Sequence, residues 1–129
     1  MSHCHFHSQS SARQFGGKPQ DYQAIHQWFD ETKAVYGDAK HRALRHHSFG
    51  IFECEKLFGY SIKNSDGKEV PVRLVAEQHV REDCGGIIPS VQDWLEGIPP
   101  KAWHNRGYGR ALAVQGVREE KDLKNDQPN

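Results

Sequence analysis

The sequence predicts a compact, single-domain, mainly α-helical fold of bundle-like architecture with one small β-hairpin. Three observations support this fold class. The chain has 129 residues, which is the size of one domain. Apolar residues recur at helical spacing in two long segments, residues 22–36 and 38–58. The pair Asp66-Gly67 separates two β-prone runs, as is typical of a hairpin turn.

The first predicted helix covers residues 22–36. Along it, Tyr22, Ile25 and Phe29 fall on one face while the charged residues lie elsewhere, so the helix is amphipathic. Gly37 follows the segment and is typical of a helix stop.

The second predicted helix, residues 38–58, has the clearest periodicity in the chain. Its stripe recurs at alternating steps of four and three residues and comprises Leu44, His47, Ile51, Cys54 and Phe58. Asp38 is suited to the N-cap, and Gly59 is suited to the position after the last turn. The short connection to the first helix predicts antiparallel packing of the two.

The pattern changes to that of β-strands after Gly59. Residues 60–63 and 70–75 are β-prone, and they flank the turn residues 64–67. Pro71 has no backbone N–H, so we expect it at a sheet edge or at a gap in the ladder.

Two shorter helices are predicted after the hairpin. Residues 76–84 are helix-forming and are followed by a Gly-Gly pair that favours termination. Residues 90–98 carry the next apolar stripe, and Ser90 and Asp93 have the spacing of a capping box. A Pro-Pro pair closes this last segment.

Composition divides the chain into three parts. Residues 1–19 are polar, end in Gly-Gly-Lys-Pro, and are expected to form an irregular or extended N-terminal arm. Residues 20–104 are the predicted globular helical domain. Residues 105–129 are the predicted polar C-terminal tail.

The charge balance and the cysteine pattern exclude several classes of protein. Lys plus Arg and Asp plus Glu both number 17, so bulk electrostatic binding of nucleic acid is not favoured. No apolar run approaches the ~18–20 residues of a membrane-spanning helix, and the N-terminus lacks the pattern of a secretory signal. The 3 Cys include no CxxC pair, which favours reduced thiols and a cytoplasmic protein. Homo-oligomerisation stays open.

Histidine is the unusual component of the chain, with 9 residues. Alternate positions would place His3, His5 and His7 on one face of an extended arm, either as metal ligands or as solvated side chains. His7 is the nearest of the three to the body of the domain.

A second histidine group lies in the predicted helix 38–58. Helical geometry places His47 in the apolar stripe, with His41 and His46 on opposite flanks about 100–120° away. One metal ion therefore cannot bind all three.

An acid–imidazole pair lies in the segment 77–83. On a helix, His79 and Asp83 are one turn apart on one face, whereas on a strand Glu77 and His79 would share a face. A carboxylate beside an imidazole suits both a metal ligand and a general base.

Together these segments predict a divalent-metal site where the second helix meets residues 77–83. The predicted ligands are His46, His47, His79 and Asp83, and either His46 or His47 decides which helix face is used. Further candidates are His7, His41, Glu53, Glu55 and Glu77. Zn²⁺ is the metal expected first, because imidazole and carboxylate are both among its ligands.

Three other functions stay open. Lys40, Arg42 and Arg45 would give helix 38–58 a basic face for nucleic acid or a protein partner. His79 and Asp83 would suit metal-free hydrolysis as a base and its orienting carboxylate. The histidines would alternatively serve folding alone.

Five stretches of the sequence carry a resemblance to a known family: SSARQFGG, DYQAIHQWFD, HRALRHHSFGIF, NSDGKEVPVRLVAEQHV and IPSVQDWL. In this order they resemble a family of short bacterial and phage-encoded proteins that has no assigned function. The resemblance covers roughly residues 7–98. It implies a cytoplasmic single-domain protein with an accessory role, and it transfers no catalytic residue.

Overall fold

The structure, a computed structural model, describes residues 4–107. The chain divides into two compact units, Met1–Leu95 and Glu96–Asn129. The described part of the second unit contains one 3₁₀ helix, η4 (Ala102–Asn105). Of the predicted C-terminal tail, residues 108–129 lie outside the described residues, as does His3 of the predicted arm.

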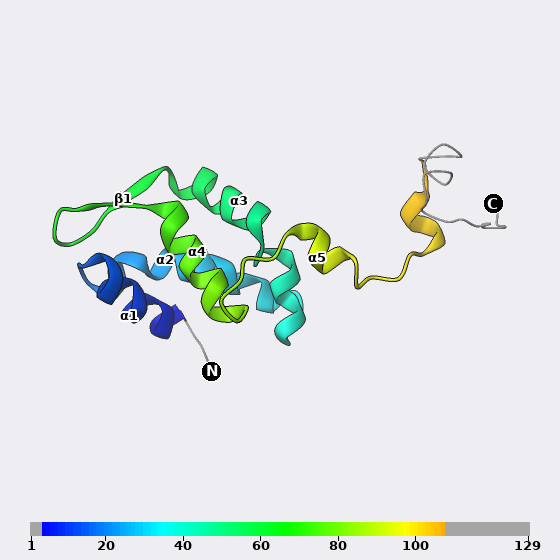
Figure 1. The fold of residues 1–129 in the computed structure, drawn as a ribbon, viewed down its shortest axis with the longest axis horizontal. Helices are drawn as coiled ribbons and strands as arrows, with labels where there is room; N and C mark the ends of the chain where they lie inside the picture. The colour runs from blue at the N-terminus through cyan, green and yellow to red at the C-terminus, as the bar shows by residue number, and fades with distance from the viewer. Residues whose placement is uncertain (1–3, 108–129) are drawn as a thin grey trace. The chain divides into compact units, whose positions relative to one another are not determined.

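The first unit is mainly helical with one small hairpin, as the sequence predicts (Figure 1). In chain order its elements are α1 (Cys4–Phe15), η1 (Pro19–Tyr22), α2 (Gln23–Asp30), η2 (Glu31–Ala34), η3 (Ala39–Leu44), α3 (Ser48–Phe58), β1 (Ser61–Lys63), β2 (Glu69–Pro71), α4 (Val72–Asp83) and α5 (Val91–Leu95). Helix α4 packs against α1, α2 and α3, so it is the central element. None of the described helices has the length and apolar character needed to cross a membrane.

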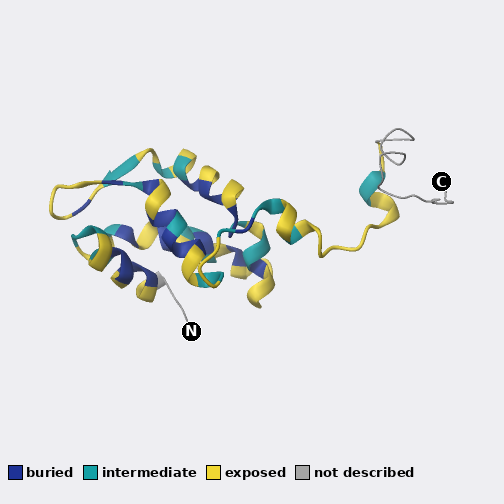
Figure 2. Ribbon diagram, in the orientation of Figure 1, coloured by how far each residue is buried: buried dark blue, intermediate teal, exposed yellow. Residues whose placement is uncertain are grey.

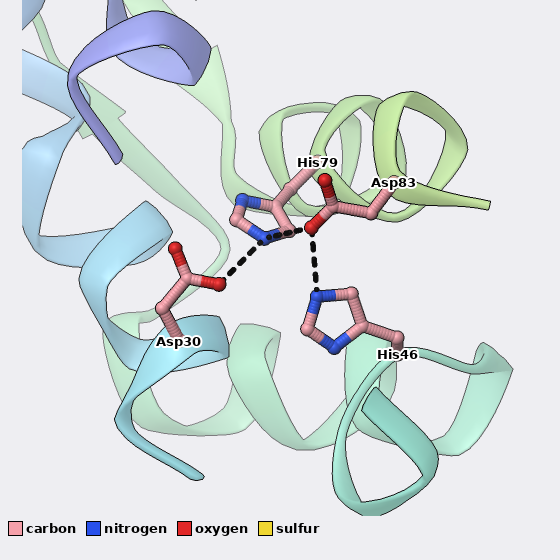
Figure 3. A group of neighbouring side chains, drawn as sticks. All are labelled: Asp30, His46, His79 and Asp83. Carbon is pink, nitrogen blue, oxygen red and sulfur yellow. Dashed lines mark hydrogen bonds and ion pairs between the residues drawn. The ribbon is translucent and has the colours of Figure 1, made fainter. Parts of the chain in front are cut away.

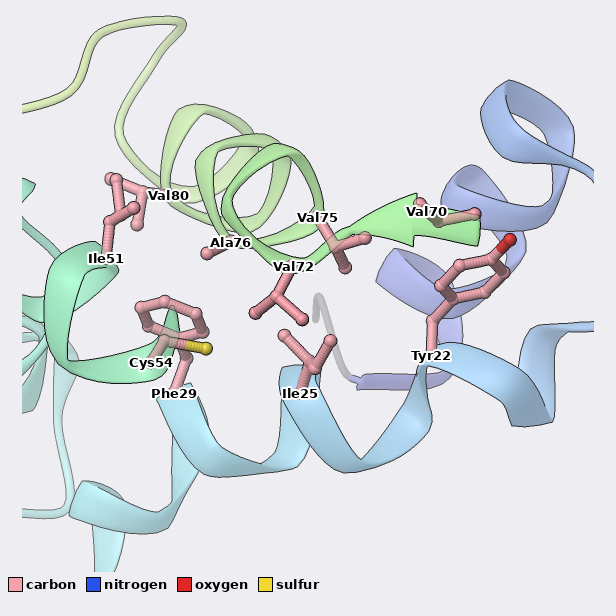
Figure 4. Close-up of a cluster of buried hydrophobic side chains, with 10 residues drawn as sticks. All are labelled: Tyr22, Ile25, Phe29, Ile51, Cys54, Val70, Val72, Val75, Ala76 and Val80. Carbon is pink, nitrogen blue, oxygen red and sulfur yellow. The ribbon is translucent and has the colours of Figure 1, made fainter. Parts of the chain in front are cut away.

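The hydrophobic core lies between α4 and the helices α2 and α3 (Figure 4). Ten apolar residues are buried there: Tyr22, Ile25, Phe29, Ile51, Cys54, Val70, Val72, Val75, Ala76 and Val80. The apolar face predicted for residues 22–36 is thus confirmed at Tyr22, Ile25 and Phe29. Burying each large side chain contributes about 1.5–3 kcal/mol, and this fixes how the three helices meet.

The N-terminal segment corrects one expectation. Residues 4–15 form the helix α1, where the sequence analysis expects an irregular or extended arm. The buried face of α1 is polar and includes His7, Ser8, Ser10 and Ser11, so hydrophobic periodicity does not reveal it (Figure 2). The helix ends at Gly16, whose φ of 87° favours glycine.

The segment 38–58 is two helices, not one. Asp38 caps η3 as expected, accepting a hydrogen bond from the Lys40 backbone N–H at 2.8 Å. The chain then becomes extended at His47, with φ −162° and ψ 173°, and α3 begins at Ser48. His47 is therefore not in a helical stripe; its Nδ1 caps α3 by accepting from the Gly50 backbone N–H at 2.9 Å.

Gly50 permits this break because a side chain there would overlap the backbone oxygen of Arg45. We expect Gly50→Ala to destabilise the protein by about 2 kcal/mol or more, since the backbone must shift to relieve the overlap. Gly37→Ala is the matched control, because nothing lies within 4 Å of a Cβ at Gly37. Urea unfolding of both variants measures the difference, and equal stabilities would contradict the expectation.

The hairpin and its Asp-Gly turn are confirmed. Strands β1 and β2 pair antiparallel, with Ile62 opposite Val70, and Gly67 in the turn has a φ of 80°. Pro71 is the last residue of β2 and the N-cap of α4. Helix α4 begins at Val72, four residues earlier than predicted, because Val72, Val75 and Ala76 pack into the core on one helical face.

The other predicted helices are present, but their lengths differ from the predicted ones. The segment 22–36 is α2 flanked by the 3₁₀ turns η1 and η2. Helix α4 ends at the Gly-Gly pair as predicted, with φ values of 68° and 94°. The capping box before α5 is confirmed by reciprocal bonds of 3.0 Å and 2.8 Å between Ser90 and Asp93, and α5 ends at Leu95.

Candidate metal centre

Four side chains from three parts of the first unit converge beside the C-terminal end of α4 (Figure 3). His79 and Asp83 lie one turn apart on α4. Asp30 is the last residue of α2, and His46 lies in the link between η3 and α3. Asp30, His46, His79 and Asp83 are called the Asp83 cluster below.

The spacing within the Asp83 cluster is that of atoms able to share one metal ion. One ligand atom from each residue lies within 4.8 Å of all the others. Asp83 Oδ2 is 3.1 Å from His46 Nε2 and 3.1 Å from His79 Nε2. His79 Nε2 is 3.5 Å from Asp30 Oδ1. Ligands bound to one ion at about 2.0–2.2 Å lie roughly 3–3.5 Å apart, so the three distances from Asp83 and His79 fit such a site.

Burial sets the charge state of the cluster. His46 and His79 are fully buried, and the Asp83 side chain is 5% exposed. Burial lowers the pKa of His46 to about 4 despite its hydrogen bond to Asp83, so this imidazole is neutral at pH 7. Burial acts to raise the pKa of Asp83, but the imidazoles of His46, His7 and His79 beside its carboxylate hold the pKa well below its ordinary value. Neutral imidazole and ionised carboxylate are the forms that bind metals.

The two oxygens of the Asp83 carboxylate have different surroundings. Oδ2 faces the imidazoles of the cluster, whereas Oδ1 lies 3.3 Å from His7 Nε2 and 3.8 Å from Arg42 Nη2. Arg42 Nη1 also donates to the backbone oxygen of Asp83 at 3.0 Å. His7 also bonds Glu82, through Nδ1 at 2.7 Å. Burial acts to lower the pKa of His7, but the carboxylates of Asp83 and Glu82 raise it above its ordinary value. Protein groups thus hold one oxygen of Asp83 and leave the other directed at the cluster.

A buried chain of hydrogen bonds begins at the Gln78 amide. Gln78 Nε2 donates to Glu82 Oε1 and to the His7 backbone oxygen, both at 3.0 Å. Its Oε1 therefore accepts the proton of Ser11 Oγ, which lies 2.6 Å away. Ser11 Oγ also lies 3.1 Å from the His7 backbone oxygen, which can only accept. Because a hydroxyl has one proton, the remaining close neighbour of Ser11 Oγ must donate to it.

That neighbour is His26, which links the chain to His79. His26 Nε2 lies 2.8 Å from Ser11 Oγ and donates to it. Burial lowers the pKa of His26 to about 2, so the ring is neutral and its Nδ1 is an acceptor. His79 Nδ1, 2.9 Å away, donates to that atom. The other ring nitrogen of His79, Nε2, is buried without a hydrogen-bond partner beside Asp83, and it is the atom that would coordinate a metal ion.

The structure brings together three of the four predicted metal ligands: His46, His79 and Asp83. The fourth, His47, lies elsewhere and uses its ring to cap α3. Of the two alternatives on this segment, His46 is therefore the residue that faces α4, and the chain break before α3 is what separates it from its neighbour.

Two further candidates border the cluster without joining it. The His7 ring packs against the His79 ring at a tilt of 37°, with centroids 4.0 Å apart. His41 is buried, lies 2.7 Å from Thr32 Oγ1 through Nδ1, and has its ring centroid 5.5 Å from that of His46. Both rings therefore pack against histidines of the Asp83 cluster.

The predicted glutamates do not reach the cluster. Glu53 and Glu55 lie on α3, with Glu53 exposed. Glu77 forms ion pairs on the surface of α4, at 2.7 Å to Arg73 and 3.7 Å to Arg81. The Glu77–His79 alternative required a strand, and the segment is helical.

The predicted basic face is largely engaged within the protein. The Arg45 guanidinium stacks over the Trp28 ring at 4.2 Å, and Arg42 binds Asp83. Lys40 forms no ion pair with any residue in the described part of the chain. No observation at these residues favours nucleic acid.

Sequence reasoning missed Asp30 and His26. Asp30 lies off the apolar face of residues 22–36, whereas His26 lies beside Tyr22 and Phe29 on that face, in a position typical of a core residue. A signal was available, however: His26 and Asp30 on α2 have the same four-residue spacing as His79 and Asp83 on α4. Two such pairs on packed helices bring two imidazoles and two carboxylates together.

The fold and this site define a small helical domain with a buried histidine–carboxylate cluster that could hold a metal ion. The chain belongs to the family described as "Domain of unknown function (DUF6915)", whose model matches residues 2–104. The resemblance to a family of no assigned function is thus confirmed, while a bacterial or phage origin stays a prediction. No curated protein and no solved structure matches the chain.

Proposed function

We propose that this protein binds one Zn²⁺ ion at the Asp83 cluster, through His46, His79, Asp83 and Asp30. Two imidazoles and two carboxylates form a mixed nitrogen–oxygen ligand set. The two imidazoles favour Zn²⁺ over Mg²⁺ or Ca²⁺, which prefer oxygen ligands throughout. Zn²⁺ also imposes no geometric preference of its own, so it accepts mixed sets.

The observation that carries the proposal is a buried nitrogen without a hydrogen-bond partner. Nε2 of His79 faces the Asp83 and Asp30 carboxylates and makes no hydrogen bond, while Nδ1 of the same ring bonds His26. A buried ring nitrogen that faces two carboxylates needs a proton or a metal ion between them. A metal ion satisfies all of them, and this favours coordination over metal-free use of His79 as a base.

Asp30 is the most exposed member of the cluster, with a side chain 16% exposed, whereas that of Asp83 is 5% exposed. It is therefore the ligand that a water or a substrate atom would replace most readily. A Zn²⁺ ion with three firm protein ligands and one exchangeable position has the arrangement of a catalytic centre, where the metal acts as a Lewis acid.

His46→Ala and His47→Ala form a matched test of the proposal. We expect His46→Ala to weaken Zn²⁺ binding by about 100-fold, since it removes a ligand. His47→Ala should leave the affinity unchanged and cost about 1 kcal/mol of stability through the lost helix cap. Competition with a chromophoric chelator measures the affinity, and thermal unfolding measures the stability.

Parallel titrations with Mn²⁺, Co²⁺ and Ni²⁺ test the choice of metal. Zn²⁺ should bind at one equivalent and compete with Mn²⁺ and Co²⁺. Equal losses of affinity in the two histidine variants, or no loss in either, would place the Zn²⁺ elsewhere and refute the proposal.

A cytoplasmic location also remains a proposal. It is supported by the free thiols of Cys54 and Cys84 among the described residues, because a reducing compartment keeps thiols unpaired. Burial raises the pKa of Cys54 to about 12, so this thiol is inert.

A further inference from the structure

A pocket of about 370 Å³ adjoins the Asp83 cluster. This volume lies within the range of small-molecule sites. Asp83 belongs to its wall, so the pocket and the cluster share a residue. Its wall includes the apolar side chains of Ile87, Pro89 and Trp94 and the charged side chains of Lys40, Arg42 and Asp83.

The charged groups of this pocket that stay available to a ligand are cationic. The Asp83 carboxylate is its one anionic wall residue, and His7, His46 and His79 already surround both of its oxygens. Arg42 donates one N–H, from Nη1, to the Asp83 backbone oxygen. Its Nη2 lies 3.8 Å from Asp83 Oδ1, which is too far for a hydrogen bond. A guanidinium with unused donors suits a carboxylate or a phosphate.

Lys40 adds a second cationic side chain to the pocket. It is exposed and forms no ion pair within the described residues, and its Nζ lies 5.9 Å from the centroid of the Tyr36 ring. Two cations therefore border a pocket whose remaining walls are mostly apolar. Such a combination selects a ligand with an anionic head and an apolar body.

Trp94 joins the apolar wall to the cluster. Its Nε1 donates to the backbone oxygen of His46 at 2.9 Å, which fixes the indole beside a proposed metal ligand. A flat, held aromatic side chain offers a stacking surface for an apolar or aromatic body. A ligand lying on Trp94 with its head at Arg42 would lie next to Asp83.

We propose that this pocket binds a small organic anion, with its oxyanion head on Arg42 and Lys40 and its apolar body against Trp94. Carboxylates and phosphate monoesters share the required chemistry. Binding of the anion does not depend on the metal. The role of the anion as a substrate of the centre rests on the proposed function.

The test is a fluorescence titration of the metal-free protein with four probes: benzoate, phenyl phosphate, benzyl alcohol and inorganic phosphate. We expect saturable quenching by benzoate or phenyl phosphate with a Kd of about 1 mM, as suits ligands of this size. Which of the two binds tighter identifies the head group. Benzyl alcohol and inorganic phosphate, which each lack one half of the chemistry, should bind at least about tenfold more weakly.

Four variants assign the signal. Trp94→Phe should remove the quenching, Arg42→Gln should weaken binding by about tenfold, and Lys40→Gln should weaken it by about threefold at low salt. Lys40→Gln keeps the test valid if loss of the Arg42 bond to Asp83 disturbs the fold. Arg73→Gln, on the exposed surface of α4, is the control and should leave binding unchanged.

Two results would overturn the inference: no saturable binding of either anion up to about 20 mM, or equal binding of benzyl alcohol. Repeating the titration with bound Zn²⁺ separates the two proposals. Anion binding by a protein that takes up no Zn²⁺ refutes only the metal centre, and Zn²⁺ uptake without anion binding refutes only the pocket.

Discussion

Asp83→Asn is expected to lower the affinity for Zn²⁺ by more than about 100-fold, because the changed side chain is central to the proposed centre. Its Oδ2 lies 3.1 Å from both imidazoles of the Asp83 cluster. An amide oxygen in its place carries no charge, and the amide nitrogen would present hydrogens to the metal. The variant also removes a buried partner of His7, which destabilises the metal-free protein by about 3 kcal/mol.

Thermal unfolding with and without Zn²⁺ measures this effect. At a Zn²⁺ concentration 100 times its Kd, the wild-type protein should gain about 2.7 kcal/mol, which raises its Tm by about 10–20 °C. Asp83→Asn should show almost none of this rise at the same concentration. A full rise in the variant would contradict the proposed centre.

Two further variants keep the result interpretable. Glu77→Gln changes another carboxylate on α4 whose partners are surface arginines, so it should retain the whole Zn²⁺-dependent rise. Asp30→Asn changes the most exposed member of the cluster and should fold while losing about 10–100-fold in affinity. If Asp83→Asn fails to fold, Asp30→Asn carries the test.

His26→Phe is expected to weaken Zn²⁺ binding by about 10–100-fold although His26 is not a ligand. The phenylalanine ring fills a similar volume but cannot accept the proton of His79 Nδ1, which lies 2.9 Å from His26 Nδ1. A buried N–H without a partner costs about 1–3 kcal/mol, and His79 is then free to move the proton to Nε2. That tautomer cannot coordinate through Nε2.

The tautomer can be read directly from the imidazole ¹⁵N shifts of the metal-free protein. We expect His79 in the wild-type protein to carry a proton on Nδ1, and His26→Phe to shift the ring towards the tautomer with its proton on Nε2. His5→Phe, at an exposed position of α1, is the control and should change neither the shifts nor the affinity. A wild-type His79 protonated on Nε2 alone would refute the hydrogen-bond chain.

Much of the fold follows from local patterns in the sequence. Ile25 and Phe29 recur at helical spacing because one face of α2 must be buried, and Asp66-Gly67 supplies the turn geometry of the hairpin. Asp38 and the Ser90–Asp93 pair mark helix starts because their side chains satisfy free backbone N–H groups. These signals act within a few residues, so they can be read without knowing the rest of the chain.

Helix α1 and the break at His47 could not be predicted in the same way. The buried face of α1 is polar, and hydrogen bonds join its His7, Ser10 and Ser11 to partners on α2 and α4, about 15 to 75 residues away along the chain. The break depends on the close approach of Gly50 to the Arg45 backbone. Contacts of both kinds leave no periodic trace in the sequence.

The sequence by itself determined the helical class, the hairpin and the two segments that supply His46, His79 and Asp83. The tertiary structure alone decided that His46 rather than His47 faces α4, that Asp30 completes the cluster, and that His26 holds the His79 tautomer. The physical reason is distance. A helix fixes which side chains share a face within one turn, but the meeting of α2, α4 and the link before α3 depends on the core that packs them together.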